Sequence, residues 1–254
     1  MSFQIVFAVP LECQSCVDSI SHVLNGLSGI TSYDIDLEDN LVTTTGTTPP
    51  STIIKAIQNT GKDAIIRGTG QPNSAAVCIL ESFDPKDMKT PVKGLARIVL
   101  VSPKDIYVDL TISGLGKGVY YPSIRSCGNL SEGAKSTGPL FHELAPVDVM
   151  EAPVTINSLG AANSENDVVS SAASTIGTPS FSGQAFLHAP LSINDLIGRS
   201  VVISSSKGEV VDDSLCGVIA RSAGVWENNK QVCSCSGKSV WEERVDARER
   251  GVDQ

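Results

Sequence analysis

Residues 3–16 read FQIVFAVPLECQSC and decide the fold of the first part of the chain. The opening run of apolar, β-prone side chains predicts a strand over residues 3–9. A helix is predicted next, because apolar residues recur at helical spacing from Val17 to Leu27, and Gly26 and Gly29 are stop signals. The stretch therefore predicts a strand that runs through a cysteine-bearing loop into a helix.

The unit that begins with this strand continues to about residue 70. Two short strands are predicted over 33–37 and 41–45, a second helix over 51–59 and a last strand over 64–67. The order is βαββαβ, which indicates a ferredoxin-like split unit over residues 1–70.

Two cysteines stand where the first strand meets its helix, with Cys13 in the loop and Cys16 at the helix start. A thiol near a helix N-terminus has a lowered pKa, because it feels the positive end of the helix dipole. No histidine or third cysteine lies nearby in sequence, and structural zinc normally takes four ligands, so two soft thiolates favour Cu(I). A thioredoxin-like redox pair or another metal is the alternative, although thioredoxin does not have the βαββαβ order.

Composition narrows the classes of function. The chain carries 28 acidic and 19 basic residues, a net charge of −9, without a Lys/Arg-rich run, which argues against nucleic acid or anionic lipid as a partner. We expect no membrane span, because no apolar run approaches the required ~20 residues, and no signal peptide at residues 1–10. Seven cysteines, an odd and clustered set, indicate soft-metal or redox chemistry rather than a disulfide scaffold.

The rest of the chain predicts an all-β domain and a tail. After a linker at 68–74, short strands alternate with Gly/Pro turns up to residue 223, which is typical of a sandwich or barrel; the predicted strands are 75–83, 96–101, 106–112, 200–204 and 216–223. Residues 157–182 are expected to form a long loop. The charged tail, residues 224–254, is expected to be irregular with a short polar helix near its end.

Cys233 and Cys235 form a CxC pair in this tail. A disulfide across one residue is strained, and a strained disulfide is more oxidising, so the pair suits disulfide transfer through a mixed intermediate. Reduced, the same pair can bind Cu(I), which leaves a second copper store as the alternative.

Residues 3–68 resemble the heavy-metal-associated domains of copper chaperones, whose signature MxCxxC reads LECQSC here. Leu11 replaces a methionine that packs beneath the loop in that family, so the departure affects rigidity more than binding. Lys62, in GKDAIIRG (61–68), matches a family lysine that faces the metal. The resemblance implies that Lys62 offsets the negative charge of Cu(I) held by two thiolates.

The middle of the chain resembles Cu,Zn superoxide dismutase in four segments: GLARIVLV (94–101), STGPLFHE (136–143), LIGRSVVI (196–203) and CGVIARSAG (216–224). A copper-binding domain, a dismutase-like domain and a CxC tail together resemble the copper chaperones for superoxide dismutase, and the tail 217–244 resembles the fungal members especially. The resemblance implies a copper-binding domain at 1–70, a Greek-key barrel at 72–223 that docks the client, and a transfer tail at 224–254 whose Cys233 and Cys235 carry the transfer.

The departures from dismutase imply that this chain is not an enzyme. The positions of the four copper histidines fall on Ser123, Arg125, Leu140 and Ser204, and the arginine that steers superoxide falls on Asp213. No histidine lies at 147–160, where zinc ligands are expected, so no zinc is expected in the barrel. A dismutase with an appended metal domain and a copper buffer are the alternative functions.

Segments through which dismutase subunits pair are retained. They imply a pseudo-symmetric heterodimer with Cu,Zn superoxide dismutase, or a homodimer, whereas the alternative is retention for core packing. The predicted client interface comprises Gly128, Gly198, Arg199, Gly217, Val218 and Ile219. The resemblance also implies a cytoplasmic protein with a share in the mitochondrial intermembrane space.

Three cysteines stand alone. Cys78 is expected to be a small core residue, and Cys127 is expected to be incidental or redox-sensitive in the interface turn. Cys216 matches one half of the dismutase disulfide, but the other half falls on Ala134, so Cys216 is expected to be buried and inert.

Overall fold

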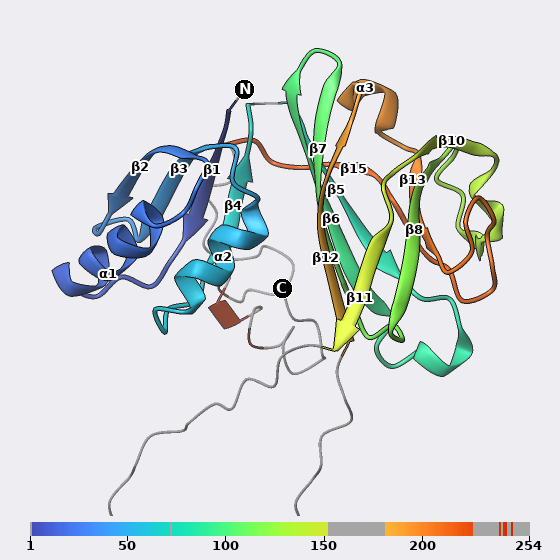
Figure 1. Ribbon diagram of the computed structural model, residues 1–254, viewed down its shortest axis with the longest axis horizontal. Helices are drawn as coiled ribbons and strands as arrows, with labels where there is room; N and C mark the ends of the chain where they lie inside the picture. Colours follow the sequence, from blue (N-terminus) through green and yellow to red (C-terminus); the bar gives the residue numbers. More distant parts are fainter. Residues whose placement is uncertain are drawn as a thin grey trace, which may run out of the picture.

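The structure is a computed structural model that describes residues 2–71, 73–151 and 181–225, with residues 239, 241, 242 and 245 of the tail. Two bodies lie side by side, an N-terminal α/β domain and a β-barrel (Figure 1). Cys233, Cys235 and most of the predicted loop and tail lie outside the described residues, so the predictions for them stay predictions.

The N-terminal domain has the predicted βαββαβ order. Its sheet runs in the order β2-β3-β1-β4 with antiparallel pairs, and the helices α1 and α2 pack on it. The elements are β1 (Phe3–Ala8), α1 (Gln14–Asn25), β2 (Ile30–Asp36), β3 (Leu41–Gly46), α2 (Pro50–Gln58) and β4 (Ile65–Thr69).

One apolar core joins the sheet of this domain to both helices. Phe7 and Val9 come from the first strand and its end, Ile20 and Leu24 from α1, and Ile57 from α2, all fully buried. Ile20 and Leu24 lie four positions apart on one face of α1, as an amphipathic helix requires. The rigid core fixes where β1 ends and α1 begins, and so positions the loop between them.

The second body is a closed antiparallel barrel. Its ring has eight strands in the order β8-β11-β12-β7-β6-β5-β14-β13, and β13 pairs with β8 to close it. The ring strands are β5 (Ala75–Glu81), β6 (Val92–Ser102), β7 (Asp105–Ser113), β8 (Gly118–Arg125), β11 (Val147–Glu151), β12 (Phe181–Ala189), β13 (Ser200–Ser204) and β14 (Leu215–Val218). Short additions are β9 (Ser131–Ala134), β10 (Leu140–Glu143), β15 (Ala220–Arg221), α3 (Ile193–Leu196) and two 3-10 turns at Pro85–Asp87 and Lys135–Thr137.

The connections make the barrel a Greek key. The chain passes from β7 to β8 across the positions of β12 and β11, and from β12 to β13 across those of β11 and β8. The predicted fold class is therefore confirmed in both bodies. Two predicted bounds in the barrel are wrong. The predicted loop ends at residue 182, whereas β12 already begins at Phe181 because Ser182 pairs with Ser113 of β7. The predicted strand 216–223 is divided into β14 and β15, because the amide of Ile219 donates to the Arg199 carbonyl oxygen between them.

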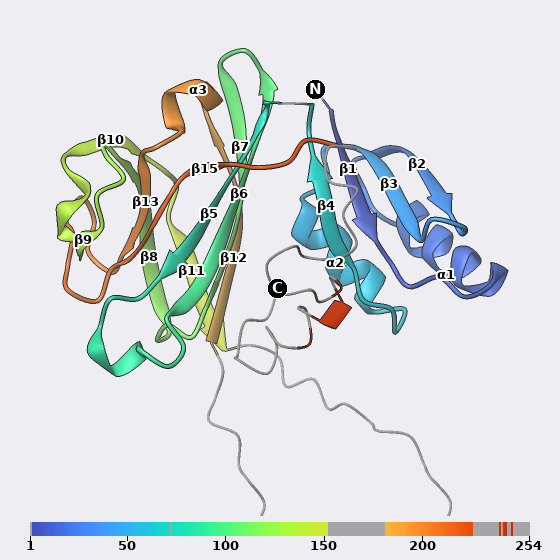
Figure 2. The same ribbon diagram turned by 180° about the vertical axis from the view of Figure 1, so that it is seen from behind.

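The last described segment of the barrel returns to the N-terminal domain. After β15 the chain crosses to the end of β4 (Figure 2). The amide of Val225 donates to the carbonyl oxygen of Gly70 at 2.9 Å, and the amide of Thr69 donates to that of Ala223 at 3.4 Å. The tail therefore starts from the junction between the two domains.

Candidate metal site and pairing surface

We call residues 9–16 the metal loop; they comprise the connection between β1 and α1 and the first residues of α1, and they bring two thiols together. Cys13 is the N-cap residue of α1 and is exposed, whereas Cys16 lies in the first turn and is half-buried. Their sulfur atoms are 3.8 Å apart. Two thiols that already converge at an open surface can bind one small soft cation with little rearrangement.

Hydrogen bonds activate Cys13. The pKa of its thiol is lowered to about 7, first because the Ser15 hydroxyl lies 2.9 Å from the sulfur and then because amide and thiol groups of Cys16 favour the thiolate. The expected direction is therefore found for Cys13, but its causes are these hydrogen bonds and not the helix dipole. The sequence argument did not include Ser15, whose hydroxyl contributes most to the lowered pKa of Cys13. The CxxC spacing identifies the two thiols but does not show where the side chain of an intervening residue points.

A cation stands beside this thiol pair. Partial burial opposes the charge on Lys62, but the neighbouring charges of Cys16 and Glu12 outweigh it and raise the pKa of Lys62. The ammonium lies 3.5 Å from the Glu12 carboxylate, within the metal loop. Lys62 is therefore a cation beside Cys16 and Glu12, and its predicted role toward a bound metal stays a prediction.

The metal loop is held from below. Leu11 is buried in the domain core, which confirms it as the packing residue beneath the loop. Its amide donates to the Asn40 side-chain oxygen at 2.7 Å, and the amide of Val9 donates to the Asn40 carbonyl oxygen at 3.0 Å. Asn40 has a φ of 57°, a left-handed conformation that asparagine tolerates better than most residues. One turn residue thus fixes both ends of the segment before Cys13.

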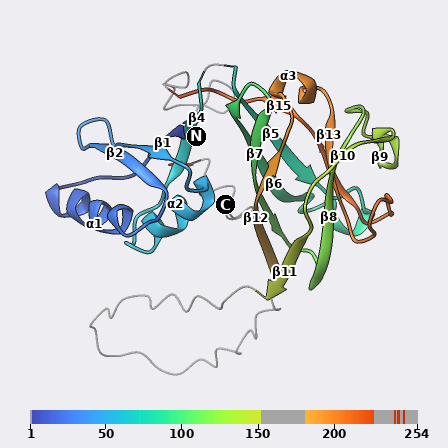
Figure 3. The same cartoon turned by 45° about the horizontal axis from the view of Figure 1, so that its top comes forward.

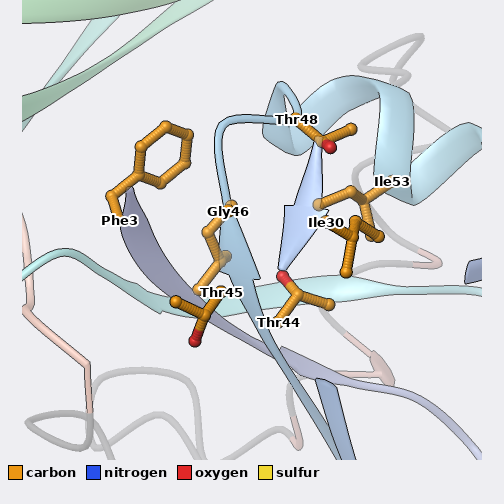
Figure 4. A pocket seen from close by; sticks show the side chains of 8 residues that line it. Phe3, Ile30, Thr44, Thr45, Gly46, Thr48 and Ile53 are labelled. Carbon is orange, nitrogen blue, oxygen red and sulfur yellow. The ribbon is translucent and has the colours of Figure 1, made fainter. Parts of the chain in front are cut away.

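A shallow pocket lies at the opposite end of β1 from this loop (Figure 4). It is lined by apolar and threonine side chains and by Gly46, without a thiol, imidazole or carboxylate. The pocket therefore offers no ligand for a soft metal.

The barrel positions that match dismutase copper ligands come together, but without ligands. Ser123 and Arg125 lie on β8, which pairs with both β10 and β13; Leu140 stands opposite Arg125, and Ser204 ends β13. Leu140 is exposed, whereas Arg125 and Ser204 are buried. Among the described residues, no group of three or more His, Cys, Asp or Glu side chains gathers as a metal site.

An exposed apolar surface lies across β5 and β14. Val218 is 38 % exposed and Ile79 is 53 % exposed. The register that pairs Cys216 with Glu81 places Val218 opposite Ile79 when continued by two residues. Gly128 and Gly198 adjoin it, since a Cβ on Gly128 would lie 2.7 Å from the Gly198 carbonyl oxygen and 3.0 Å from Val218. We call Ile79, Gly128, Gly198 and Val218 the pairing surface.

The other predicted interface residues support this surface from beneath. Ile219 is buried in the barrel core, and Gly217 is buried against the backbone of Ile79. The Arg199 guanidinium lies 3.8 Å from the Phe141 ring centroid and donates to the Ser126 carbonyl oxygen at 2.8 Å, so it holds the turn before Gly128. Sequence reasoning missed Ile79, because a run such as AAVCILE does not reveal which of its apolar residues point outward.

Comparison with known proteins places the chain. Residues 6–63 match the heavy-metal-associated domain. The superoxide dismutase 1 copper chaperone of Debaryomyces hansenii is 64 % identical, over 99 % of this chain and 98 % of that protein. That of Saccharomyces cerevisiae is 43 % identical, over 97 % of this chain and 96 % of that protein. The chain belongs to the superoxide dismutase copper chaperone family. These relatives are named copper chaperones, and as a member of their family this chain is a metallochaperone and not a dismutase.

The three lone cysteines of this chaperone differ from the metal-loop pair. Burial raises the pKa of both Cys78 and Cys216 to about 12, which leaves them protonated at neutral pH. Cys78 lies in the barrel core and Cys216 in a small cluster with Ala134, which confirms that both are buried. Cys127 is half-buried and donates to the Ser136 carbonyl oxygen at 3.4 Å. Within the described part of the chaperone, no helix is long and apolar enough to cross a membrane.

Proposed function

We propose that this protein takes up copper as Cu(I) through Cys13 and Cys16, docks Cu,Zn superoxide dismutase as a heterodimer, and activates it. Activation comprises delivery of copper and formation of the client's disulfide by exchange, in which a Cys233–Cys235 disulfide is reduced to two thiols as two client thiols are oxidised. The observation that carries the proposal is the pair of sulfur atoms 3.8 Å apart at the exposed start of α1, beside the cation Lys62.

The donor set supports Cu(I). Two thiolates are soft ligands, and Cu(I) accepts low coordination numbers, whereas structural zinc asks for four ligands. Lys62 reduces the net negative charge that two thiolates around a monovalent ion leave behind. The barrel positions Ser123, Arg125, Leu140 and Ser204 offer no imidazole, which supports a barrel without copper or zinc of its own.

The pairing surface supports docking. A barrel that resembles one half of a symmetric dimer presents the same patch that its partner presents in return. Ile79 and Val218 are exposed apolar side chains on that patch, and glycines beside them allow close approach of a second backbone. The relatives' names state that they serve superoxide dismutase, and a dismutase subunit is the partner that this patch is proposed to take.

The place where the tail leaves the barrel supports a transfer role for Cys233 and Cys235. Val225 is bonded to Gly70 at the domain junction, so Cys233 follows eight residues after a point that is fixed to the N-terminal domain. The eight residues 226–233 span at most about 26–29 Å when extended. Docking raises the effective concentration of such a tethered pair near the client.

Charge at the pairing surface tests the docking step. Val218→Asp places an unpaired carboxylate where two apolar patches meet, so affinity for copper-free dismutase should fall by about 100-fold or more. Met150→Asp is the matched control, because Met150 is 62 % exposed on β11, away from this surface. Sedimentation of the mixed proteins reads the result. Unchanged affinity in Val218→Asp would refute docking through this surface.

Removal of the tail thiols tests the transfer step. Cys233→Ser with Cys235→Ser should leave docking and copper uptake by the metal loop intact, while the client stays without its disulfide. A single replacement should trap a mixed disulfide, visible by non-reducing electrophoresis. Normal activation by the double variant under limiting copper would show that another group makes the transfer.

A copper buffer is the second candidate, and the exposed thiol pair alone favours it. A buffer needs no partner surface, so it predicts that Val218→Asp and Met150→Asp behave alike. A dismutase with an appended metal domain predicts superoxide turnover by the isolated chaperone supplied with copper and zinc.

A further inference from the structure

The first turn of α2 receives its cap from the other domain. Pro49 is the N-cap residue, and its side chain offers no hydrogen bond. Instead the Asp109 carboxylate of β7 accepts from the Ser51 amide at 3.0 Å and from the Ser51 hydroxyl at 2.6 Å. A carboxylate at a helix N-terminus satisfies open amides and stabilises the positive end of the dipole.

This contact is buried. Asp109 is 1 % exposed and Ser51 is 6 % exposed. Arg97 stands opposite Asp109 on β6, and its guanidinium nitrogen lies 3.6 Å from the carboxylate. Burial raises the pKa of Asp109, and the hydrogen bonds from Ser51 and the charge of Arg97 oppose this rise. Separation of the two domains would remove the Ser51 contacts that stabilise this charge.

Apolar contacts surround the capped turn. Phe186 of β12 stacks on Tyr107 of β7 with centroids 4.6 Å apart and planes at 9°, and its ring lies 6.3 Å from that of Phe3 in the N-terminal domain. Val99 of the barrel belongs to the core cluster of the N-terminal domain. Lys55 of α2 donates to Gln184 of β12. The domains thus share a packed interface centred on α2, the helix that faces β7 and β12 (Figure 3).

The segment that follows β15 also contacts the end of β4, where the two domains are connected. Val225 bonds to Gly70, and a Cβ on Gly68 would lie only 2.2 Å from the Gly224 carbonyl oxygen. These contacts tie the end of β4 to the segment that follows β15.

We propose that Asp109 is a positioning residue that holds the copper-binding domain in one orientation on the barrel. Copper is then collected from Cys13 and Cys16 at a fixed place, instead of being carried to the client by a swing of the domain. This inference rests on the proposed copper delivery. It is compatible with access to the thiols, because α1 lies on the side of its domain away from the barrel and Cys13 is exposed (Figures 1 and 3).

Rotational diffusion of the full chain tests the orientation directly. Backbone ¹⁵N relaxation should give one correlation time for both domains in the wild type, and a shorter one for the N-terminal domain in Asp109→Ala. Asp105→Asn is the matched control, because this β7 carboxylate contacts only barrel partners, Ser102 and His188, in the described structure. A single correlation time in Asp109→Ala overturns the proposal.

A double-mutant cycle guards against a folding defect. Ser51→Ala removes the hydrogen bond that the Ser51 hydroxyl donates to Asp109, while the bond from the Ser51 amide remains. It should therefore shorten the correlation time of the N-terminal domain by a smaller amount than Asp109→Ala does. In the Asp109→Ala background Ser51→Ala should add almost nothing, because the two residues act as a unit. Additive effects, or a Ser51→Ala variant that tumbles as the wild type does, would contradict the cap.

The rate of dismutase activation tests whether the fixed orientation matters for copper transfer. Copper-loaded Asp109→Ala should activate copper-free, reduced Cu,Zn superoxide dismutase about 5–10-fold more slowly, with its Cu(I) affinity unchanged in chelator competition. A rate equal to or above that of the wild type overturns the positioning role. If the wild type itself does not activate dismutase, the proposed function fails, while the relaxation data still decide the orientation.

Discussion

The metal loop and the barrel face formed by β8, β10 and β13 are both places where family resemblance locates copper ligands. The loop keeps two thiols, 3.8 Å apart, and surrounds them with Ser15 and Lys62. The barrel face keeps its strands and pairings, but a serine, an arginine and a leucine stand at three of the ligand positions. Strand pairing depends on the core beneath it, whereas metal binding depends on a few side chains, so a fold persists when its chemistry is lost.

Removal of the loop thiols should have the largest effect. A chain with Cys233→Ser and Cys235→Ser should bind about one equivalent of Cu(I), and further replacement of Cys13 and Cys16 by Ser should reduce it to almost none, because no soft ligand pair remains. Metal analysis after gel filtration measures the ratio, with Cys127→Ser as control. Copper retained by the four-serine chain would place a site in the barrel and break the comparison.

Gly217→Ala should destabilise the barrel and spare the metal loop. An added Cβ would lie 1.8 Å from the Ile79 carbonyl oxygen and 2.9 Å from the Cys78 sulfur, so backbone must move. We expect a loss of about 1–3 kcal/mol in the free energy of unfolding, measured by chemical denaturation. Gly118→Ala is the control, since a Cβ there would lie 3.8 Å from the Tyr120 ring, an ordinary contact distance. Equal stabilities would show that the approach of β14 to β5 is looser than described.

The thiols of the two regions should differ in their pH profiles. With a pKa of about 7, Cys13 is half ionised near neutral pH, so its alkylation rate should rise through pH 6–8 and then level off. Cys78 and Cys216, with pKa values of about 12, should stay unreacted. Ser15→Ala removes a donor to the thiolate, raises the pKa of Cys13 and slows the reaction at pH 7, whereas Ser19→Ala should not. Site-resolved mass spectrometry separates the cysteines, and a Cys13 midpoint above about pH 8.5 would contradict the assignment.

Lys62→Met should have the smallest effect. It removes a cation beside the thiolates, so Cu(I) affinity should fall by only about 2–5-fold, because the group is partly exposed and screened. The difference should shrink at about 0.5 M salt. Chelator competition measures the affinity, with Lys104→Met on the barrel as control. A loss as large as that of the cysteine variants would make Lys62 indispensable rather than supportive.

The sequence was most informative where one short segment carries both fold and chemistry. The βαββαβ order follows from local periodicity and glycine stops, and CxxC displays its ligands directly. In the barrel, β8 was not predicted, because Pro122 interrupts a run that otherwise reads as a strand, yet Pro122 pairs opposite Ile203. Strand β12 contains Gly183 and polar residues, and its identity depends on pairing with β7.

Contacts between distant segments lay beyond prediction. Ser51 and Asp109 are 58 residues apart, and neither is unusual in its own segment. The outward orientation of Ile79 depends on the register of β5 against β14. Such facts follow from tertiary packing, which one sequence without relatives does not encode in any local pattern.

The burial of Cys78 and Cys216 has a consequence for the order of thiol exchange. A disulfide moves by attack of a thiolate on a sulfur atom, so a thiol that is inaccessible and protonated cannot enter the chain of exchanges. Since burial holds the pKa of both barrel thiols at about 12, a disulfide passing through this protein cannot scramble onto either of them. The two buried barrel thiols therefore take no part in thiol–disulfide exchange, which is confined to thiols at the surface.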